Sequence, residues 1–98
     1  MRIEYHPRVA LELNDAVTYY DKIQTGLGSQ LRREVYAAIE RILANPNWYK
    51  RQEEQIRRCP VRNFPWTIFY RVFDDAEVVR ILVIRHQRRR PRYGLARN

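Results

Sequence analysis

The residues best suited to chemistry in this sequence are arginines gathered near its C-terminus. Residues 85–98 contain six arginines and no acidic residue, and the run Arg85-His86-Gln87-Arg88-Arg89-Arg90 directly follows an apolar segment. Arg57-Arg58 and Arg62 lie beside an earlier apolar segment. Guanidinium groups bind phosphate and carboxylate through planar, bidentate hydrogen bonds. The sequence therefore predicts a binding site for an anionic ligand.

The charge of the chain is unevenly distributed. Residues 1–50 hold seven Lys or Arg against six Asp or Glu, whereas residues 51–98 hold twelve arginines against five acidic residues. Only two of the nineteen cationic residues, Lys22 and Lys50, are lysine. This preference for arginine favours recognition of a polyanion. A GC-rich genome gives the same bias, and a solvated basic tail is the simpler alternative to a binding site.

Length and composition limit the class of protein. Ninety-eight residues with 45% hydrophobic and 31% charged side chains suit one folded domain, residues 1–98. No apolar run approaches the roughly 20 residues of a membrane span, and the N-terminus MRIEYHPR lacks the apolar core of a secretory signal. The single cysteine, Cys59, cannot form an internal disulfide, so we expect a cytoplasmic protein.

Motifs for cofactors and metals are not found. The sequence contains no glycine-rich phosphate loop, no Cys/His cluster at metal-binding spacing, and no Ser-His-acid set in a recognisable context. We therefore expect neither a metal nor a cofactor, and the arginines remain the candidates for function.

The first half of the chain has the pattern of a strand followed by two helices. Met1–Tyr5 alternates apolar and polar residues, as a short strand does, and proline at position 7 suits the start of a helix. Apolar residues then recur at helical spacing in two stretches separated by the Thr25–Ser29 turn, and the second stretch ends at Asn45-Pro46-Asn47. The apolar positions are Val9, Leu13, Ala16, Val17, Tyr20 and Ile23, then Leu31, Val35, Ala38, Ile39, Ile42 and Leu43.

The second half reads as a loop followed by three strands. Residues 48–54 are polar and irregular, and strands are expected at residues 55–61, 66–73 and 78–86, with a hairpin turn at 74–77. The predicted fold is α+β, in the order β-α-α-β-β-β, with a helical hairpin on one face of a small, mostly antiparallel sheet. The last two strands are apolar on both faces. The chain termini or a partner must therefore cover the face that the helices leave open.

The expected strand pairing would gather the cations. If the strands 66–73 and 78–86 are antiparallel neighbours, Arg85 and His86 lie beside Pro65-Trp66, and Arg62 is close to them. Several guanidinium groups and one imidazole would then converge at one end of the sheet, where a polyanion or an acidic protein segment would offset their mutual repulsion.

Four motifs of the sequence resemble those of one known superfamily. The segment Phe64–Val72 (FPWTIFYRV) resembles the F-P-aromatic-x-I-x-Y-x-V strand of the RelE/ParE toxins of toxin–antitoxin systems, and His86–Pro91 resembles their H-x-R-R-x-P ending. Ala44-Asn45-Pro46 and the Arg57-Arg58 pair also fit, and the match covers nearly the whole chain. The aromatic residue that often lies three positions after that proline is here Gly94, with Tyr93 one position earlier.

The resemblance implies a bacterial toxin, often involved in plasmid stabilisation, that an acidic cognate antitoxin neutralises. The two alternatives for its assembly are a toxin–antitoxin hetero-oligomer and a toxin homodimer. RelE-like members cut mRNA on the ribosome, and ParE-like members poison DNA gyrase. In a RelE-like, metal-free ribonuclease, Arg58, Arg62 and Arg85 would hold phosphate, and His86 or Tyr93 would move protons.

The chain has no lysine near its arginine cluster, and its strand and tail motifs are closer to the ParE-like branch. We therefore expect a ParE-like toxin that blocks gyrase by binding, without an enzymatic activity of its own. A RelE-like ribonuclease and a non-toxic basic domain that binds nucleic acid are the two alternatives.

Overall fold

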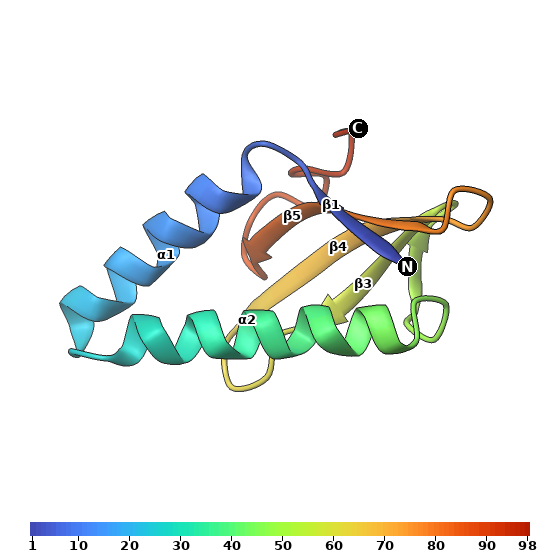
Figure 1. Ribbon diagram of the computed structural model, residues 1–98. Helices are drawn as coiled ribbons and strands as arrows, with labels where there is room; N and C mark the ends of the chain where they lie inside the picture. The colour runs from blue at the N-terminus through green and yellow to red at the C-terminus, as the bar shows by residue number, and fades with distance from the viewer.

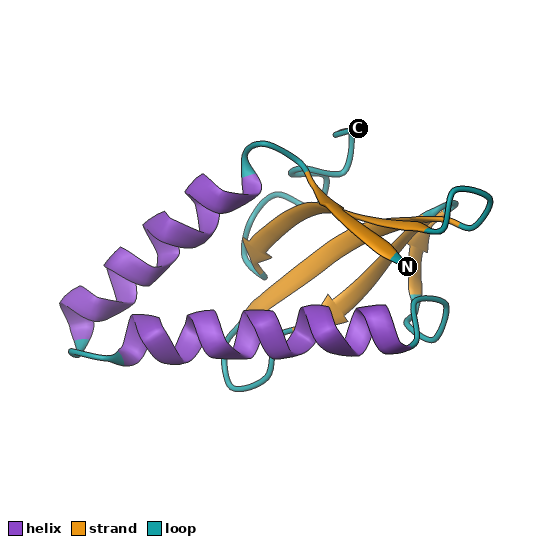
Figure 2. Cartoon of the chain, viewed as in Figure 1, coloured by secondary structure: helices purple, strands orange, loops and turns teal.

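The computed structural model describes all 98 residues and shows two helices packed on one face of a five-stranded sheet (Figures 1 and 2). This arrangement confirms the predicted α+β fold with a helical hairpin. In chain order the elements are β1 (Arg2–Tyr5), α1 (Val9–Ile23), α2 (Leu27–Ala44), β2 (Arg51–Glu53), β3 (Ile56–Pro60), β4 (Trp66–Phe73) and β5 (Val78–His86). Neither helix is long and apolar enough to cross a membrane.

The sheet has the strand order β1-β5-β4-β3-β2. Only the β1–β5 pair is parallel, and the other three pairs are antiparallel. The register of β4 and β5 sets Trp66 opposite His86 and Thr67 opposite Arg85, as expected from the sequence. β1 pairs only with Val78–Ile81, so the C-terminal half of β5 has no neighbouring strand on its outer side.

The helix boundaries differ slightly from those expected. Pro7 does not open α1 but lies in the preceding turn, where the His6 carbonyl oxygen accepts from the N–H of Val9. The connection between the helices is also shorter than the predicted Thr25–Ser29 turn, because α2 already begins at Leu27. Gly26, with φ of 90°, precedes it in the left-handed conformation that glycine adopts most readily.

A strand that the sequence did not predict lies at the edge of the sheet. Residues 48–54 were expected to form a loop, yet Arg51–Glu53 forms β2, paired with β3 across an irregular register. The segment RQE has no β-branched or aromatic residue, so its strand conformation comes from hydrogen bonding to β3 rather than from its own propensity.

The main core lies between the helices and the sheet. Buried residues of α1 and α2, such as Leu13, Leu31 and Ile42, pack against the helix-facing side chains of β3, β4 and β5, such as Cys59, Ile68 and Ile84. The apolar periodicity of the two helices therefore predicted which of their faces is buried, except at Ile23, which is 60% exposed at the end of α1.

The opposite face of the sheet is covered by the C-terminal tail, residues 87–98. Leu95 is 1% exposed and packs in a second cluster with residues of β3, β4 and β5: Ile56, Phe69, Leu82 and Val83. Gly94 lets the tail approach this closely, because its φ is 80° and a Cβ added there would lie 2.6 Å from Cβ of Val83. Of the two alternatives left open by the sequence, covering by a chain terminus is the one observed.

We expect Gly28→Ala to lower the free energy of unfolding by about 1–3 kcal/mol, the usual cost of overpacking. The added methyl carbon would overlap the Val17 carbonyl oxygen, so α1 and α2 would have to separate. Urea unfolding followed by circular dichroism measures this change. Ser29→Ala, at an exposed position of the same helical turn, should change the free energy by less than about 0.5 kcal/mol. Equal unfolding midpoints for the two variants would contradict the prediction.

Candidate functional site

Two adjoining pockets lie near the C-terminal end of β5, and both are lined by Arg85 and Arg89. The first, which we call the arginine groove, has a volume of about 490 Å³ and lies on the tail side of the sheet. Arg58, Arg85 and Arg89 line it together with Gln52, Pro60, Thr67, Phe69, Gln87 and Pro91. No acidic residue is among these lining residues, so the groove is suited to an anion.

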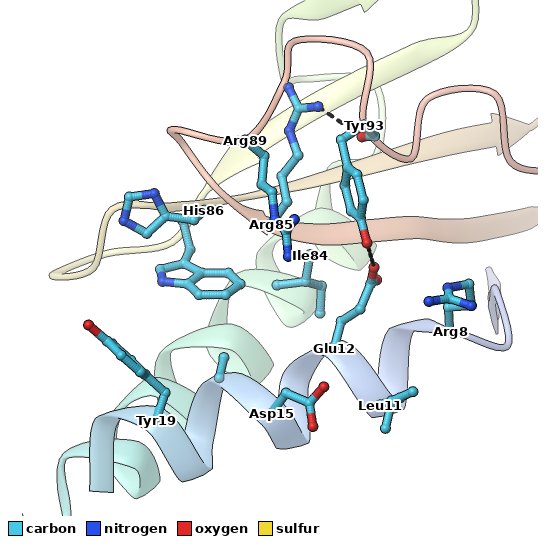
Figure 3. A pocket seen from close by; sticks show the side chains of 12 residues that line it. Arg8, Leu11, Glu12, Asp15, Tyr19, Ile84, Arg85, His86, Arg89 and Tyr93 are labelled. Carbon is cyan, nitrogen blue, oxygen red and sulfur yellow. Dashed lines mark hydrogen bonds between the residues drawn. The ribbon is translucent and has the colours of Figure 1, made fainter. Parts of the chain in front are cut away.

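The second pocket, which we call the helix pocket, has a volume of about 310 Å³ and lies between α1 and the end of β5 (Figure 3). Its lining mixes cations, acids and aromatic side chains: Arg8, Glu12, Asp15, Tyr19, Trp66, Arg85, His86, Arg89 and Tyr93 among others. Two of the predicted site residues, His86 and Tyr93, lie here and not in the arginine groove.

Arg85 is the only charged residue among the buried residues and is 8% exposed. Its Nη1 donates to the carbonyl oxygens of Arg90, Pro91 and Tyr93 at 3.0, 2.9 and 2.8 Å, and its guanidinium carbon lies 4.3 Å from the centroid of the Phe69 ring. Burial lowers the pKa of Arg85, but an arginine this basic keeps its charge at neutral pH. Arg85 therefore holds the tail in place and also supplies uncompensated positive charge to both pockets.

Arg58 and Arg89 are the more accessible cations of the arginine groove. Arg58 on β3 is half-buried and donates from Nη1 to Oε1 of Gln52 at 3.3 Å. Arg89 in the tail is exposed, with its guanidinium carbon 4.7 Å from the centroid of the Tyr93 ring. The four ion pairs of the protein involve Arg2, Arg80, Arg92 and Arg97. The three arginines of the groove thus have no carboxylate partner.

His86 lies on the other side of the sheet from Arg58. Successive residues of a strand face opposite sides, so Arg85 faces the tail side and His86 faces the helices, where its ring meets the edge of Trp66 at a centroid distance of 5.8 Å. The Nδ1 atom of His86 accepts the N–H of Arg88 at 3.0 Å. This bond fixes the turn that leads from β5 into the tail.

Tyr93 and Arg97 attach the tail to α1 through Glu12. The Tyr93 hydroxyl donates to Oε2 of Glu12 at 2.7 Å, and both terminal nitrogens of Arg97 donate to the same carboxylate at 2.8 and 2.7 Å (Figure 3 shows the bond of Tyr93). Arg97 Nη1 also donates to the Leu82 carbonyl oxygen, at the part of β5 that β1 leaves unpaired. Burial alone would raise the pKa of Glu12, but the hydrogen bonds from Arg97 and Tyr93 outweigh it and lower the pKa.

Four of the five predicted site residues line the two pockets: Arg58 lines the arginine groove, His86 and Tyr93 line the helix pocket, and Arg85 lines both. Arg62 lines neither pocket and lies exposed in the turn between β3 and β4. Sequence reasoning missed the roles of Glu12 and Arg97. No local signal identifies Glu12, because its partners lie more than 80 positions away in the sequence.

The sequence and the fold were compared with those of known proteins. A model of the family described as the ParE toxin of the type II toxin–antitoxin system parDE matches residues 3–91. The chain belongs to this toxin family. Its membership and fold agree with the resemblance in the FPWTIFYRV strand and the HQRRRP ending, and a toxin of this kind implies an antitoxin partner.

Solved structures of such toxins share the fold of this ParE family member. The chromosomal ParDE system from P. aeruginosa gives a TM-score of 0.73 at 15% identity, over 88% of this chain and 95% of that one. The isolated E. coli RelE toxin gives a TM-score of 0.68 at 18% identity, over 97% of this chain and 93% of that one. A search among curated proteins found no match.

We expect the Glu12 contacts to stabilise the ParE-family fold at neutral pH and to be lost in acid. The pKa of Glu12 is lower in the folded protein than in the unfolded chain, where it is about 4.5. As the pH falls, the unfolded chain therefore binds the proton first. The stabilisation declines as the pH falls below about 4.5 and is lost below the folded-state pKa. Glu12→Gln should therefore lower the free energy of unfolding by about 1–3 kcal/mol at pH 7 and by much less near pH 3.

Thermal unfolding of the wild type and the variant at both pH values measures this difference. Asp15→Asn removes an exposed carboxylate from the same helix and serves as the control, with little change at either pH. A Glu12→Gln effect that is equally large at pH 3 and pH 7 would show that ionisation of Glu12 is not its cause.

Proposed function

We propose that this chain is a ParE-like toxin that blocks DNA gyrase by binding, through the arginine groove and the adjoining tail, in the bacterial cytoplasm. The single observation that carries the proposal is a groove lined by three arginines without a carboxylate partner. Membership of the ParE family supports the choice of gyrase as the target, as the sequence resemblance implied.

The state of the proton-transfer candidates also favours binding over catalysis. A metal-free ribonuclease needs a base and an acid at one phosphate. Here the Tyr93 hydroxyl donates to Glu12, and Nδ1 of His86 accepts a backbone N–H. His86 and Arg58 also face opposite sides of the sheet, so one phosphate cannot readily contact both.

A RelE-like, ribosome-dependent ribonuclease is the second candidate. One observation favours it: Arg85, His86 and Tyr93 line the same helix pocket, so a cation and two groups able to exchange protons lie around one space. In this alternative the target RNA would have to displace Glu12 from Tyr93.

Purified toxin should inhibit supercoiling by gyrase. Arg58→Ala and Arg89→Ala should each weaken this inhibition by about tenfold, because a hydrogen bond to a charged group contributes about 1.5–3 kcal/mol. Arg33→Ala removes an exposed arginine on α2 outside both pockets, and its inhibition should equal that of the wild type. No inhibition at tens of equivalents of toxin would contradict the proposal.

Two cellular measurements separate the alternatives. Codon-phased cuts in translated mRNA after induction, seen by primer extension, would support the ribonuclease. Unchanged growth after induction would instead support a non-toxic nucleic-acid-binding domain.

We further propose that the antitoxin is acidic, because the toxin has a formal net charge of +8. Co-purification with the untagged product of the adjacent reading frame tests this.

A further inference from the structure

One side of the arginine groove is formed by the tail. Arg58 and Arg85 come from strands, whereas Arg89 comes from an exposed segment that also holds Arg88 and Arg90. Neighbouring cations repel one another, and a long side chain on such a segment would ordinarily sample many rotamers. Arg89 instead lies over the ring of Tyr93, at 4.7 Å from its centroid.

The position of that ring is set from α1. Glu12 accepts from the Tyr93 hydroxyl and from both terminal nitrogens of Arg97, whose guanidinium carbon lies 5.2 Å from the Tyr93 centroid. The side chains of Glu12 and Arg97 are 14% and 12% exposed, so these bonds are shielded from water. Buried residues on either side of Glu12, such as Val9, Leu13 and Ala16, fix its helix against the core.

We propose that Glu12 is a positioning residue for the arginine groove: it holds Tyr93 so that Arg89 faces Arg58 and Arg85, and the three arginines together bind backbone phosphates of DNA. Glu12 itself lines the helix pocket and not the groove. The inference deepens the proposed function, because it names the chemical group that the toxin recognises in a complex of gyrase and DNA.

Phosphate is the ligand chemistry that best fits the groove. Three guanidinium groups without carboxylate partners offer more donors than one carboxylate can accept, and the amide side chains of Gln52 and Gln87 add neutral donors at the rim. An open groove of about 490 Å³ has room for a backbone phosphate and its sugar without a base-reading pocket. We therefore expect binding that depends on salt and little on sequence.

The proposal predicts that removing the charge of Glu12 weakens anion binding, whereas electrostatics alone predicts stronger binding. Glu12 is a negative charge near a cationic groove, so its removal would strengthen anion binding if charge alone mattered. If Glu12 positions Arg89 through Tyr93, its removal weakens binding. Asp15 offers the matched comparison, because it also lines the helix pocket on α1 but has no hydrogen-bond or ion-pair partner.

The experiment measures binding of a fluorescein-labelled 20-base-pair DNA duplex to full-length toxin by anisotropy at pH 7. Glu12→Gln should weaken binding by about fivefold or more, and the slope of log K against log salt should become shallower by about 0.9, the contribution of one phosphate contact. Asp15→Asn should leave binding unchanged or slightly tighter, with the slope of the wild type.

A double-mutant cycle identifies the path of the effect. Arg89→Ala should weaken binding on its own, and adding Glu12→Gln to it should cause no further loss, since both changes remove the same contact. If Glu12→Gln does not fold, Tyr93→Phe gives the same test, because it removes the bond to Glu12 while keeping the ring and the Glu12–Arg97 pair. It should also weaken binding and make the slope shallower.

Several outcomes would overturn the inference. Equal effects of Glu12→Gln and Asp15→Asn, or additive effects of Glu12→Gln and Arg89→Ala, would remove the positioning role. A wild-type toxin that binds no duplex, or binds only a single-stranded RNA of the same length, would refute DNA phosphate as the ligand. If that same toxin still inhibits gyrase, the proposed function holds although DNA phosphate is not the ligand. DNA binding that depends on Glu12, without gyrase inhibition, would overturn the proposed function alone.

Discussion

The structure depends on a buried guanidinium that bonds to the protein's own backbone. Arg85 is the second-last residue of a strand whose other residues are mostly apolar, and three carbonyl oxygens of the tail converge on its Nη1. A buried charge is costly unless it is hydrogen-bonded, and the three tail carbonyls supply such bonds to Nη1 of Arg85. This interaction folds the tail back over the sheet, brings Leu95 onto the second apolar face and places the remaining arginines beside β3.

Three acidic residues near the tail and the sheet form ion pairs with arginines. Glu4 pairs with Arg2 and Arg80, Glu53 with Arg92, and Glu12 with Arg97. These pairs neutralise cations that fasten strands and tail, and they leave the groove arginines uncompensated. Only four of the nineteen cationic residues take part in ion pairs, and three of the others, Arg58, Arg85 and Arg89, line one groove. Such an arrangement focuses positive potential at one margin of the sheet.

Local patterns predicted the architecture well because they reflect local physics. The periodicity of Leu31, Val35 and Ile42 marked the buried face of α2, and the strand expected at residues 78–86 has the bounds of β5. The failures came where long-range contacts decide. β2 forms only because β3 is beside it, and Glu12, which is not among the apolar positions of its helix, is bound by residues of the tail. Strand alternation could have separated Arg85 from His86, which face opposite sides of the sheet, but the arginine cluster as a whole suggested a single site.

The parallel pairing of β1 with β5 has a consequence for how the molecule folds. The register joins Arg2 to Val78 and Tyr5 to Ile81, so the beginning of the chain can join the sheet only after the last strand exists. Pairing of such distant segments has an entropic cost of loop closure, so we expect the β1–β5 pair to form after the helical hairpin and the β3–β4 ribbon that lie between them in the sequence. Intermediates that contain only the helical hairpin and the β3–β4 ribbon would lack β5 and the tail, and with them two of the three arginines of the groove.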